Sequence, residues 1–82
     1  MKQVIRFTAS WCSPCKVYAP TFEKVSIETS GVEFKTIDAD SGDPRILEFG
    51  IRNLPTTVVV ENGNIRKQTG IMSVEQLKNF IG

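Results

Sequence analysis

The two cysteines of the chain, Cys12 and Cys15, stand three positions apart in the stretch SWCSPCK, and the chain has no histidine. We expect Cys12 at the end of a strand and at the start of a helix. The first N–H groups of a helix lack intrahelical partners and carry positive partial charge, which stabilises an anion placed against them. We therefore expect the pKa of Cys12 to lie below the free-thiol value of about 8.5, giving a thiolate that reacts near neutral pH.

Positions three apart are neighbours on a helix, so Cys15 is expected to lie on the same side of the first turn as Cys12. This arrangement suits thiol–disulfide exchange. Cys12 attacks a substrate disulfide, a mixed disulfide forms, and Cys15 then attacks the Cys12 sulfur to release the reduced substrate. The neighbouring residues modulate this chemistry: Pro14 stiffens the loop, Lys16 adds a cation on a flexible side chain, and Trp11 offers a flat surface to a partner.

Four short segments of the chain are predicted to form strands. They are rich in β-branched or alternating apolar residues and cover residues 4–9, 32–40, 56–60 and 65–69. The turn Asn62-Gly63 favours a tight hairpin between the last two. The first strand–helix–strand unit is long enough for a parallel, right-handed crossover.

Three helices are expected between and after these strands. The first begins near Pro14, ends before Gly31 and is kinked at Pro20 by the missing N–H and the bulky ring. Its buried face is expected to carry Val17, Tyr18, Phe22 and Val25. A short second helix begins at Asp43-Pro44 and ends at Gly50. The last helix begins with a capping box formed by Ser73 and Gln76.

The order of elements is therefore β-α-β-α-β-β-α. It predicts an α/β fold with one domain over residues 1–82, in which a four-stranded mixed sheet is flanked by helices on both faces. The five phenylalanines are assigned to the core.

Composition argues against several classes of partner. The net charge is only +1 and no basic run is present, so nucleic-acid binding is not indicated. The apolar run at the N-terminus is short and broken by Arg6, unlike a signal peptide, and no segment approaches the roughly 20 apolar residues that span a bilayer. We therefore expect a cytoplasmic monomer without a membrane partner. In that reducing compartment a close cysteine pair indicates redox or metal chemistry.

The stretch WCSPCK resembles the active-site pattern of the thioredoxin family, W-C-G-P-C-K, with Ser13 in place of the glycine. Pro20 matches the helix-kinking proline of that family. The stretch NLPTTVVVENGNI, residues 53–65, resembles its I-P-T motif followed by a strand and an N-G turn, and Gly70 resembles the glycine between its last strand and last helix. The family's N-terminal strand and helix have no counterpart, which leaves a layout of glutaredoxin size.

The resemblance implies a thiol-disulfide oxidoreductase that reduces protein disulfides through a reversible Cys12–Cys15 disulfide. It implies no bound cofactor and no metal, because electrons come from a partner, an NADPH-linked thioredoxin reductase or a similar enzyme. It also implies a cis bond between Leu54 and Pro55 and pairing of the Leu54 backbone with an incoming peptide. The residues assigned to substrate binding are Trp11, Leu54, Pro55 and Gly70.

The chain departs from the thioredoxin pattern at Arg6, where the family carries a buried aspartate, and at Phe34, where it carries the accompanying lysine. Two interpretations of Arg6 stay open. The side chain reaches an open sheet edge and pairs with an acid, which we favour because long basic side chains tend to reach water. Alternatively, its charge lies beneath the cysteines, favours the thiolate and makes the protein a weaker reductant. The redox potential of Arg6→Asp separates the two.

A metal-binding module is the first alternative function. With no histidine and no second cysteine pair, a tetrahedral site would need a dimer or carboxylate ligands. The acidic cluster after the second strand lacks the spacing of a calcium loop, and turn and cap chemistry explains it better. Its members are Asp38, Asp40 and Asp43.

Two further alternatives keep the fold but change the role. A glutathione-dependent, glutaredoxin-like enzyme fits the size of the chain. However, Ser13-Pro14 resembles thioredoxin, and the stretch GIMS at residues 70–73 stands where glutaredoxins carry Gly-Gly-x-x-Asp. A pure interaction module would keep full biological activity in a Cys12→Ser variant.

Overall fold

The computed structural model describes all 82 residues, and its elements follow the predicted order. The strands and helices are β1 (Lys2–Thr8), α1 (Ser13–Glu28), β2 (Val32–Asp38), α2 (Arg45–Glu48), β3 (Thr56–Glu61), β4 (Asn64–Thr69) and α3 (Val74–Ile81). Five strand limits differ from the prediction by one or two residues: β1 covers residues 2–8 instead of 4–9, β3 ends at Glu61 instead of Val60, and β2 and β4 differ at one limit each. The second strand stops at Asp38 because that residue begins a hydrogen-bonded turn, and the fourth begins one residue early, at Asn64. None of the helices is long and apolar enough to cross a membrane.

The four strands form one mixed sheet in the order β2-β1-β3-β4. The pair β1 and β2 is parallel, whereas β3 is antiparallel to both β1 and β4. The hairpin between β3 and β4 turns at Asn62 and Gly63, with φ of 53° and 81°. Both residues occupy the left-handed region that a tight two-residue hairpin requires, which is why Asn-Gly predicts this turn.

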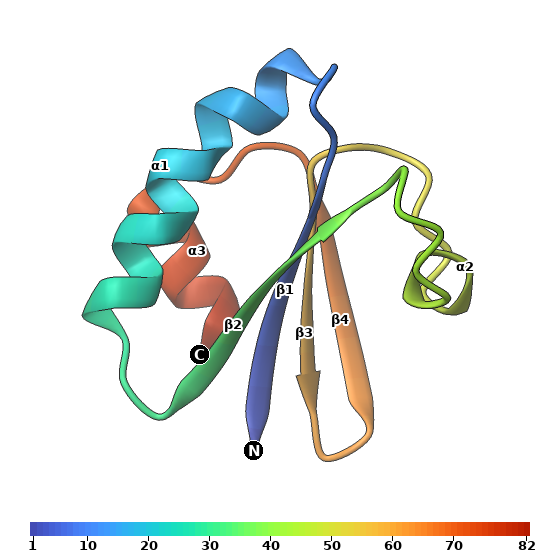
Figure 1. Ribbon diagram of the computed structural model, residues 1–82. Helices are drawn as coiled ribbons and strands as arrows, with labels where there is room; N and C mark the ends of the chain where they lie inside the picture. The colour runs from blue at the N-terminus through green and yellow to red at the C-terminus, as the bar shows by residue number, and fades with distance from the viewer.

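The helices cover both faces of the sheet, as predicted (Figure 1). Helices α1 and α3 lie on one face and α2 lies on the other. Alternate residues of β1 divide between the two cores, since Val4 faces α1 and α3 whereas Ile5 and Phe7 face the α2 side. On the α1 and α3 face, the buried cluster comprises Val4, Tyr18, Phe22, Val25, Val59, Met72, Leu77 and Ile81. On the opposite face it comprises Ile5, Phe7, Ile37, Phe49 and Val58.

The buried face of α1 differs from the prediction at one residue. Tyr18, Phe22 and Val25 are buried as expected, but Val17 is 65% exposed. Cys15 takes the fourth position on the buried face, because residues 15, 18, 22 and 25 follow the helical period and Val17 lies about a third of a turn from the centre of that face. Pro20 lies inside the helix, as predicted, and its position is exposed.

The start of α3 confirms its predicted cap, whereas α2 begins at Arg45, just after the predicted Asp43-Pro44 start, with Pro44 as its N-cap. Ser73 and Gln76 form the reciprocal capping box at the start of α3. Before α2, the Oδ1 of Asp43 accepts a hydrogen bond from the Arg45 main-chain N–H at 2.9 Å. The chain leaves α2 through Gly50, whose φ of 63° suits a glycine.

Arg6 lies half-buried on β1, and its surroundings differ from the expectation of an acidic partner. Its Nε donates a hydrogen bond to Thr36 Oγ1 at 2.9 Å, and its guanidinium carbon lies 5.1 Å from the centre of the Phe22 ring. Arg6 forms no ion pair. The prediction of an acidic partner was wrong, because the strand register places Thr36 of the edge strand β2 directly beside Arg6. The Thr36 hydroxyl and the face of the Phe22 ring contact the cation instead.

A buried hydrogen bond joins α1 to the centre of the sheet. The hydroxyl groups of Tyr18 and Thr57 lie 2.7 Å apart, and both residues are fully buried. Burial raises the pKa of Tyr18 above its ordinary value, which outweighs the opposing effects of the Thr57 hydrogen bond and the Arg6 charge. The phenol therefore stays protonated in the folded protein at a pH where it ionises in the unfolded chain.

We expect this linkage to lower stability as the pH rises above about 10, the ordinary tyrosine pKa. Replacing Tyr18 with Phe costs about 1–2 kcal/mol at neutral pH, because Thr57 loses its partner, and it removes this alkaline contribution. Urea unfolding of both proteins at neutral pH and at about pH 10.5 measures the effect. Tyr18 is the only tyrosine of the chain, so equal alkaline losses in the two proteins contradict the prediction.

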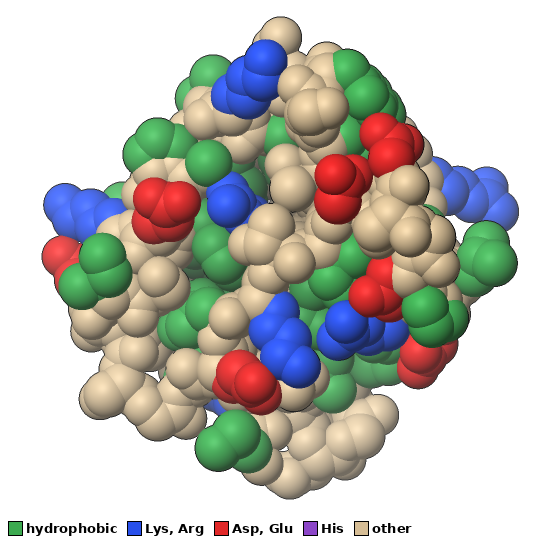
Figure 2. All heavy atoms as spheres, viewed as in Figure 1, with side chains coloured by type: hydrophobic (Ala, Val, Ile, Leu, Met, Phe, Trp, Pro, Cys, Tyr) green, Lys and Arg blue, Asp and Glu red, His purple; other side chains and the backbone are tan.

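Charged side chains are dispersed over the face drawn in Figure 2. Acidic and basic groups alternate there, and apolar side chains show between them. This face therefore carries no continuous field of one sign.

Candidate active site

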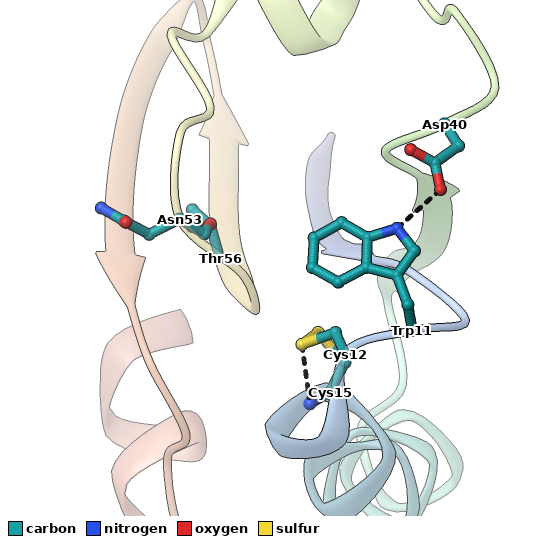
Figure 3. The surroundings of a disulfide bond; sticks show 6 residues. All are labelled: Trp11, Cys12, Cys15, Asp40, Asn53 and Thr56. Atoms are coloured by element: carbon teal, nitrogen blue, oxygen red, sulfur yellow. Dashed lines mark hydrogen bonds between the residues drawn. A yellow bond between two sulfur atoms is a disulfide. The ribbon is translucent and has the colours of Figure 1, made fainter.

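The cysteine pair lies where β1 gives way to α1. Cys12 has extended backbone geometry and caps the helix, and the main-chain N–H of Cys15 donates a hydrogen bond to Cys12 Sγ at 3.2 Å (Figure 3). The two residues form a disulfide with their Cα atoms 5.3 Å apart. This arrangement confirms the expected placement of Cys12 at the helix start, with a first-turn amide directed at its sulfur.

The two cysteines differ in how a partner can reach them. Cys12 is 5% exposed and borders an open groove, whereas Cys15 is 2% exposed and does not line the groove. Both pack against Ala9, with Ala39 and Leu54 at the edge of the cluster. A substrate sulfur can therefore approach Cys12 more easily than Cys15.

The groove beside Cys12 has a volume of about 410 Å³ and is mostly apolar. Trp11 and Asn53 lie on opposite sides of the disulfide in Figure 3. The groove is lined by Trp11, Cys12, Ala39, Ile46 and the segment from Ile51 to Leu54. An apolar groove with few polar groups is typical of a site that binds an extended peptide or a small ligand.

Trp11 is 67% exposed, so it presents the flat surface that the sequence predicts. Its Nε1 donates a hydrogen bond to Asp40 Oδ2 at 2.8 Å, which holds the indole beside the disulfide (Figure 3). Sequence reasoning explained Asp40 only as a turn residue and missed this contact. The contact could have been predicted from the topology. Because β1 and β2 are parallel neighbours, the residues that follow each strand lie at the same edge of the sheet.

We expect Asp40→Ala to release the indole. The fluorescence anisotropy of Trp11, the only tryptophan, should fall. The value of kcat/KM for disulfide reduction should drop about threefold, because a mobile indole must be ordered when the substrate binds. Glu23→Ala, which removes an exposed acid from α1, serves as the charge-matched control. Unchanged anisotropy in Asp40→Ala contradicts the prediction.

The remaining acidic residues of this loop serve local structure. Asp38 Oδ1 accepts the main-chain N–H of Asp40 at 2.8 Å. The hydrogen bonds from Arg45 lower the pKa of Asp43 to about 2, so this carboxylate stays charged well into acid. Turn and cap chemistry is thus confirmed for Asp38 and Asp43. No group of three or more potential ligand side chains lies close enough to hold a metal ion.

The bond between Leu54 and Pro55 is cis, as the resemblance implied. Pro55 is buried, and its carbonyl accepts a hydrogen bond from the Gly70 N–H at 2.8 Å. None of the main-chain hydrogen bonds outside the helices and strands involves Leu54, which is half-buried against the cysteines. Of the residues assigned to substrate binding, Leu54 and Trp11 line the groove, whereas Pro55 and Gly70 do not.

The other predicted site residues lie around the first turn of α1 or away from it. Ser13, Pro14 and Lys16 are exposed on that turn, and Lys16 forms no ion pair. Arg6 instead contacts Thr36 and Phe22. The modulating roles of these four residues stay predictions.

Comparison with known proteins gives a match over the whole chain, since the sequence model of the family described as Thioredoxin fits residues 1–82. The chain belongs to the thioredoxin family. A thioredoxin of Haemophilus influenzae is 34% identical over 80 residues, which are 95% of this chain and 75% of its relative. A thioredoxin of Mycoplasmoides gallisepticum is 32% identical over 81 residues, 98% of this chain and 81% of its relative.

Solved structures agree with this assignment. Chloroplastic thioredoxin z is 28% identical and superposes with a TM-score of 0.86, covering 100% of this chain and 76% of the other. The thioredoxin of Malassezia sympodialis is 37% identical, with a TM-score of 0.85 and coverage of 98% and 71%. Membership of the thioredoxin family and the redox-active Cys12–Cys15 disulfide make the protein a protein-disulfide oxidoreductase.

Five residues that line this thioredoxin-family groove were not predicted as site residues: Ala39, Ile46, Ile51, Arg52 and Asn53. Two of them, Arg52 and Asn53, line the groove directly before Leu54. Arg52 and Asn53 could have been predicted from their positions, because they directly precede the Leu54-Pro55 motif that was assigned to substrate binding. Their residue types did not indicate a site, because an arginine and an asparagine in a loop are ordinary solvent-facing residues.

Proposed function

We propose that the protein reduces disulfides of protein substrates, with Cys12 as the attacking nucleophile and Cys15 as the resolving thiol. The observation that carries the proposal is the Cys15 N–H, which points at Cys12 Sγ from 3.2 Å. In the reduced protein this amide and the positive end of α1 stabilise a thiolate on Cys12. The greater exposure of Cys12 supports its role as the sulfur that meets the substrate.

The reaction proceeds through two exchanges of sulfur partners. The Cys12 thiolate attacks one sulfur of the substrate disulfide, and the other substrate sulfur leaves as a thiolate that takes a proton. Cys15, deprotonated, then attacks Cys12 Sγ, and the second substrate thiolate leaves. The substrate gains two electrons and two protons, and the protein is left with the Cys12–Cys15 disulfide.

Substrate docking uses the edge of the groove. The main-chain groups of Leu54 are free to pair with an extended substrate segment, which adds a short strand next to the cysteines. Pro55 and Gly70 hold that edge in place through their mutual hydrogen bond, while Trp11 covers the opposite side. Ser13, Pro14 and Lys16 lie exposed on the first turn of α1 and modulate the reactivity of the two cysteines.

A separate reductase recharges the disulfide, and we propose an NADPH-linked thioredoxin reductase working with a monomeric, cytoplasmic protein. Membership of the thioredoxin family supports this electron source. Arg6 does not contact the cysteines in this arrangement and modulates the redox potential only through its charge. An unchanged potential in Arg6→Asp removes that role.

The test is an insulin-reduction assay with three electron donors: dithiothreitol, glutathione, and NADPH with thioredoxin reductase. We expect turnover with dithiothreitol and with the reductase, and little with glutathione. Turnover that depends on glutathione would replace the proposed donor, and no turnover with any donor would overturn the reductase function itself.

A further inference from the structure

A second pocket adjoins the groove beside Cys12 and differs from it in the residues that line it. It has a volume of about 210 Å³ and opens between β4 and the loop that precedes β3. The two spaces share one wall, the segment Ile51, Arg52 and Asn53, which lines both. A group bound in the second pocket therefore lies close to a peptide docked along Leu54.

The charges of this pocket have one sign. Arg52 and Lys67 are its only ionisable residues, and no acidic residue lines it. Neither cation forms an ion pair elsewhere in the protein. Arg52 is exposed, whereas Lys67 Nζ donates one hydrogen bond to the Phe49 carbonyl at 2.7 Å and is thereby held at the pocket.

Polar side chains complete the lining. Thr69 supplies an exposed hydroxyl, and Asn53 points away from the disulfide in Figure 3, toward the side of β4. The hydroxyl of Thr56 donates to the Asn53 carbonyl and so fixes the shared wall. The residues that line the pocket therefore carry a guanidinium, an ammonium, an amide and a hydroxyl, and groups of these kinds donate hydrogen bonds to a carboxylate.

We propose that this pocket binds a carboxylate that the substrate protein carries beside its disulfide, so that the enzyme prefers acidic disulfide substrates. The inference rests on the proposed function, because the carboxylate is delivered by a substrate docked on Leu54. Arg52 is the specificity residue, since it lines the groove and the pocket together. Lys67 adds a second positive charge from β4.

The expected preference is modest because the pocket is open to water. One solvent-screened ion pair corresponds to roughly a threefold to fivefold change in kcat/KM. The preference should shrink as the ionic strength rises from about 0.1 M to 1 M, where the screening length falls from about 10 Å to 3 Å.

The test uses two peptide disulfides that differ only in Glu or Gln two residues from the reacting cysteine, with dithiothreitol as the donor. The measured quantity is the ratio of kcat/KM for the Glu peptide to that for the Gln peptide. We expect a ratio of about three to five in the wild type and a ratio near one in Arg52→Gln. Arg52→Lys should keep most of the preference, and Lys24→Gln, which removes a charge from α1, should keep all of it.

The source of the anion is tested with inorganic phosphate. Competition by phosphate for the Glu peptide, but not for the Gln peptide, supports a pocket that recognises the substrate carboxylate. A ratio near one in the wild type overturns the proposal, and so does phosphate binding to the protein without any peptide preference. Reduction of the Gln peptide shows that the protein reduces disulfides, whether or not the Glu peptide is preferred. It therefore separates a failure of this proposal from a failure of the proposed function.

Discussion

Replacing Cys12 with Ser removes disulfide reduction, with kcat/KM falling by more than about a thousandfold. The reason is chemical, because a serine hydroxyl stays protonated near neutral pH and cannot form the mixed disulfide. The site has no other thiol to take over, since Cys15 is 2% exposed and does not reach the groove. Insulin reduction with dithiothreitol as donor measures the loss.

Replacing Cys15 with Ser gives a different result, which separates the two roles. Cys12 still attacks, but the mixed disulfide cannot be resolved, so the protein accumulates as a covalent adduct with its substrate. Non-reducing electrophoresis and mass spectrometry detect that adduct. The control is the thermal stability of both variants against the reduced wild type. Adducts that form through residue 15 in Cys12→Ser would contradict the assignment.

Replacing Leu77 with Ala lowers the free energy of unfolding by about 2–5 kcal/mol. Leu77 is fully buried in the cluster that joins α3 to α1 and the sheet, so its removal leaves a cavity. A chain of 82 residues has a thin margin of stability, because total stabilities of proteins lie between about 5 and 15 kcal/mol and small proteins fall at the low end. Urea unfolding measures the change.

Asn79 supplies the matched control for Leu77. It is exposed on the same helix, so Asn79→Ala should change the free energy of unfolding by no more than about 0.5 kcal/mol. Equal losses in the two variants contradict the assigned packing of α3. A loss confined to Leu77→Ala shows that the buried contact, and not helix propensity, holds α3 to the sheet.

The parts of the fold that sequence predicts well depend on local chemistry. Asn62-Gly63 specifies its turn because both residues tolerate positive φ, and Ser73 with Gln76 specifies the start of α3 because each satisfies the amide of the other. Cys12 and Cys15 follow the same logic, since their spacing alone places them on one helical turn. Each of these signals lies within a few residues of the chain.

The parts that sequence predicts poorly depend on how distant segments meet. The exposure of Val17 depends on the rotation of α1 against the sheet, and the hydroxyl partner of Arg6 depends on the strand register. The bond from Trp11 to Asp40 joins residues that are 29 positions apart. The proposed role of Arg52 depends on its position between the groove and the second pocket, both of which it lines. Periodicity and motif spacing carry none of this information.

The titration of the Cys12 thiol tests the central claim most directly. Cys15→Ser isolates that thiol, and its rate of alkylation by iodoacetamide as a function of pH gives its pKa. The position of Cys12 Sγ against the Cys15 N–H and the start of α1 predicts a pKa below the free-thiol value of about 8.5. A pKa at or above that value would show that the helix start does not stabilise the thiolate, and would contradict the account.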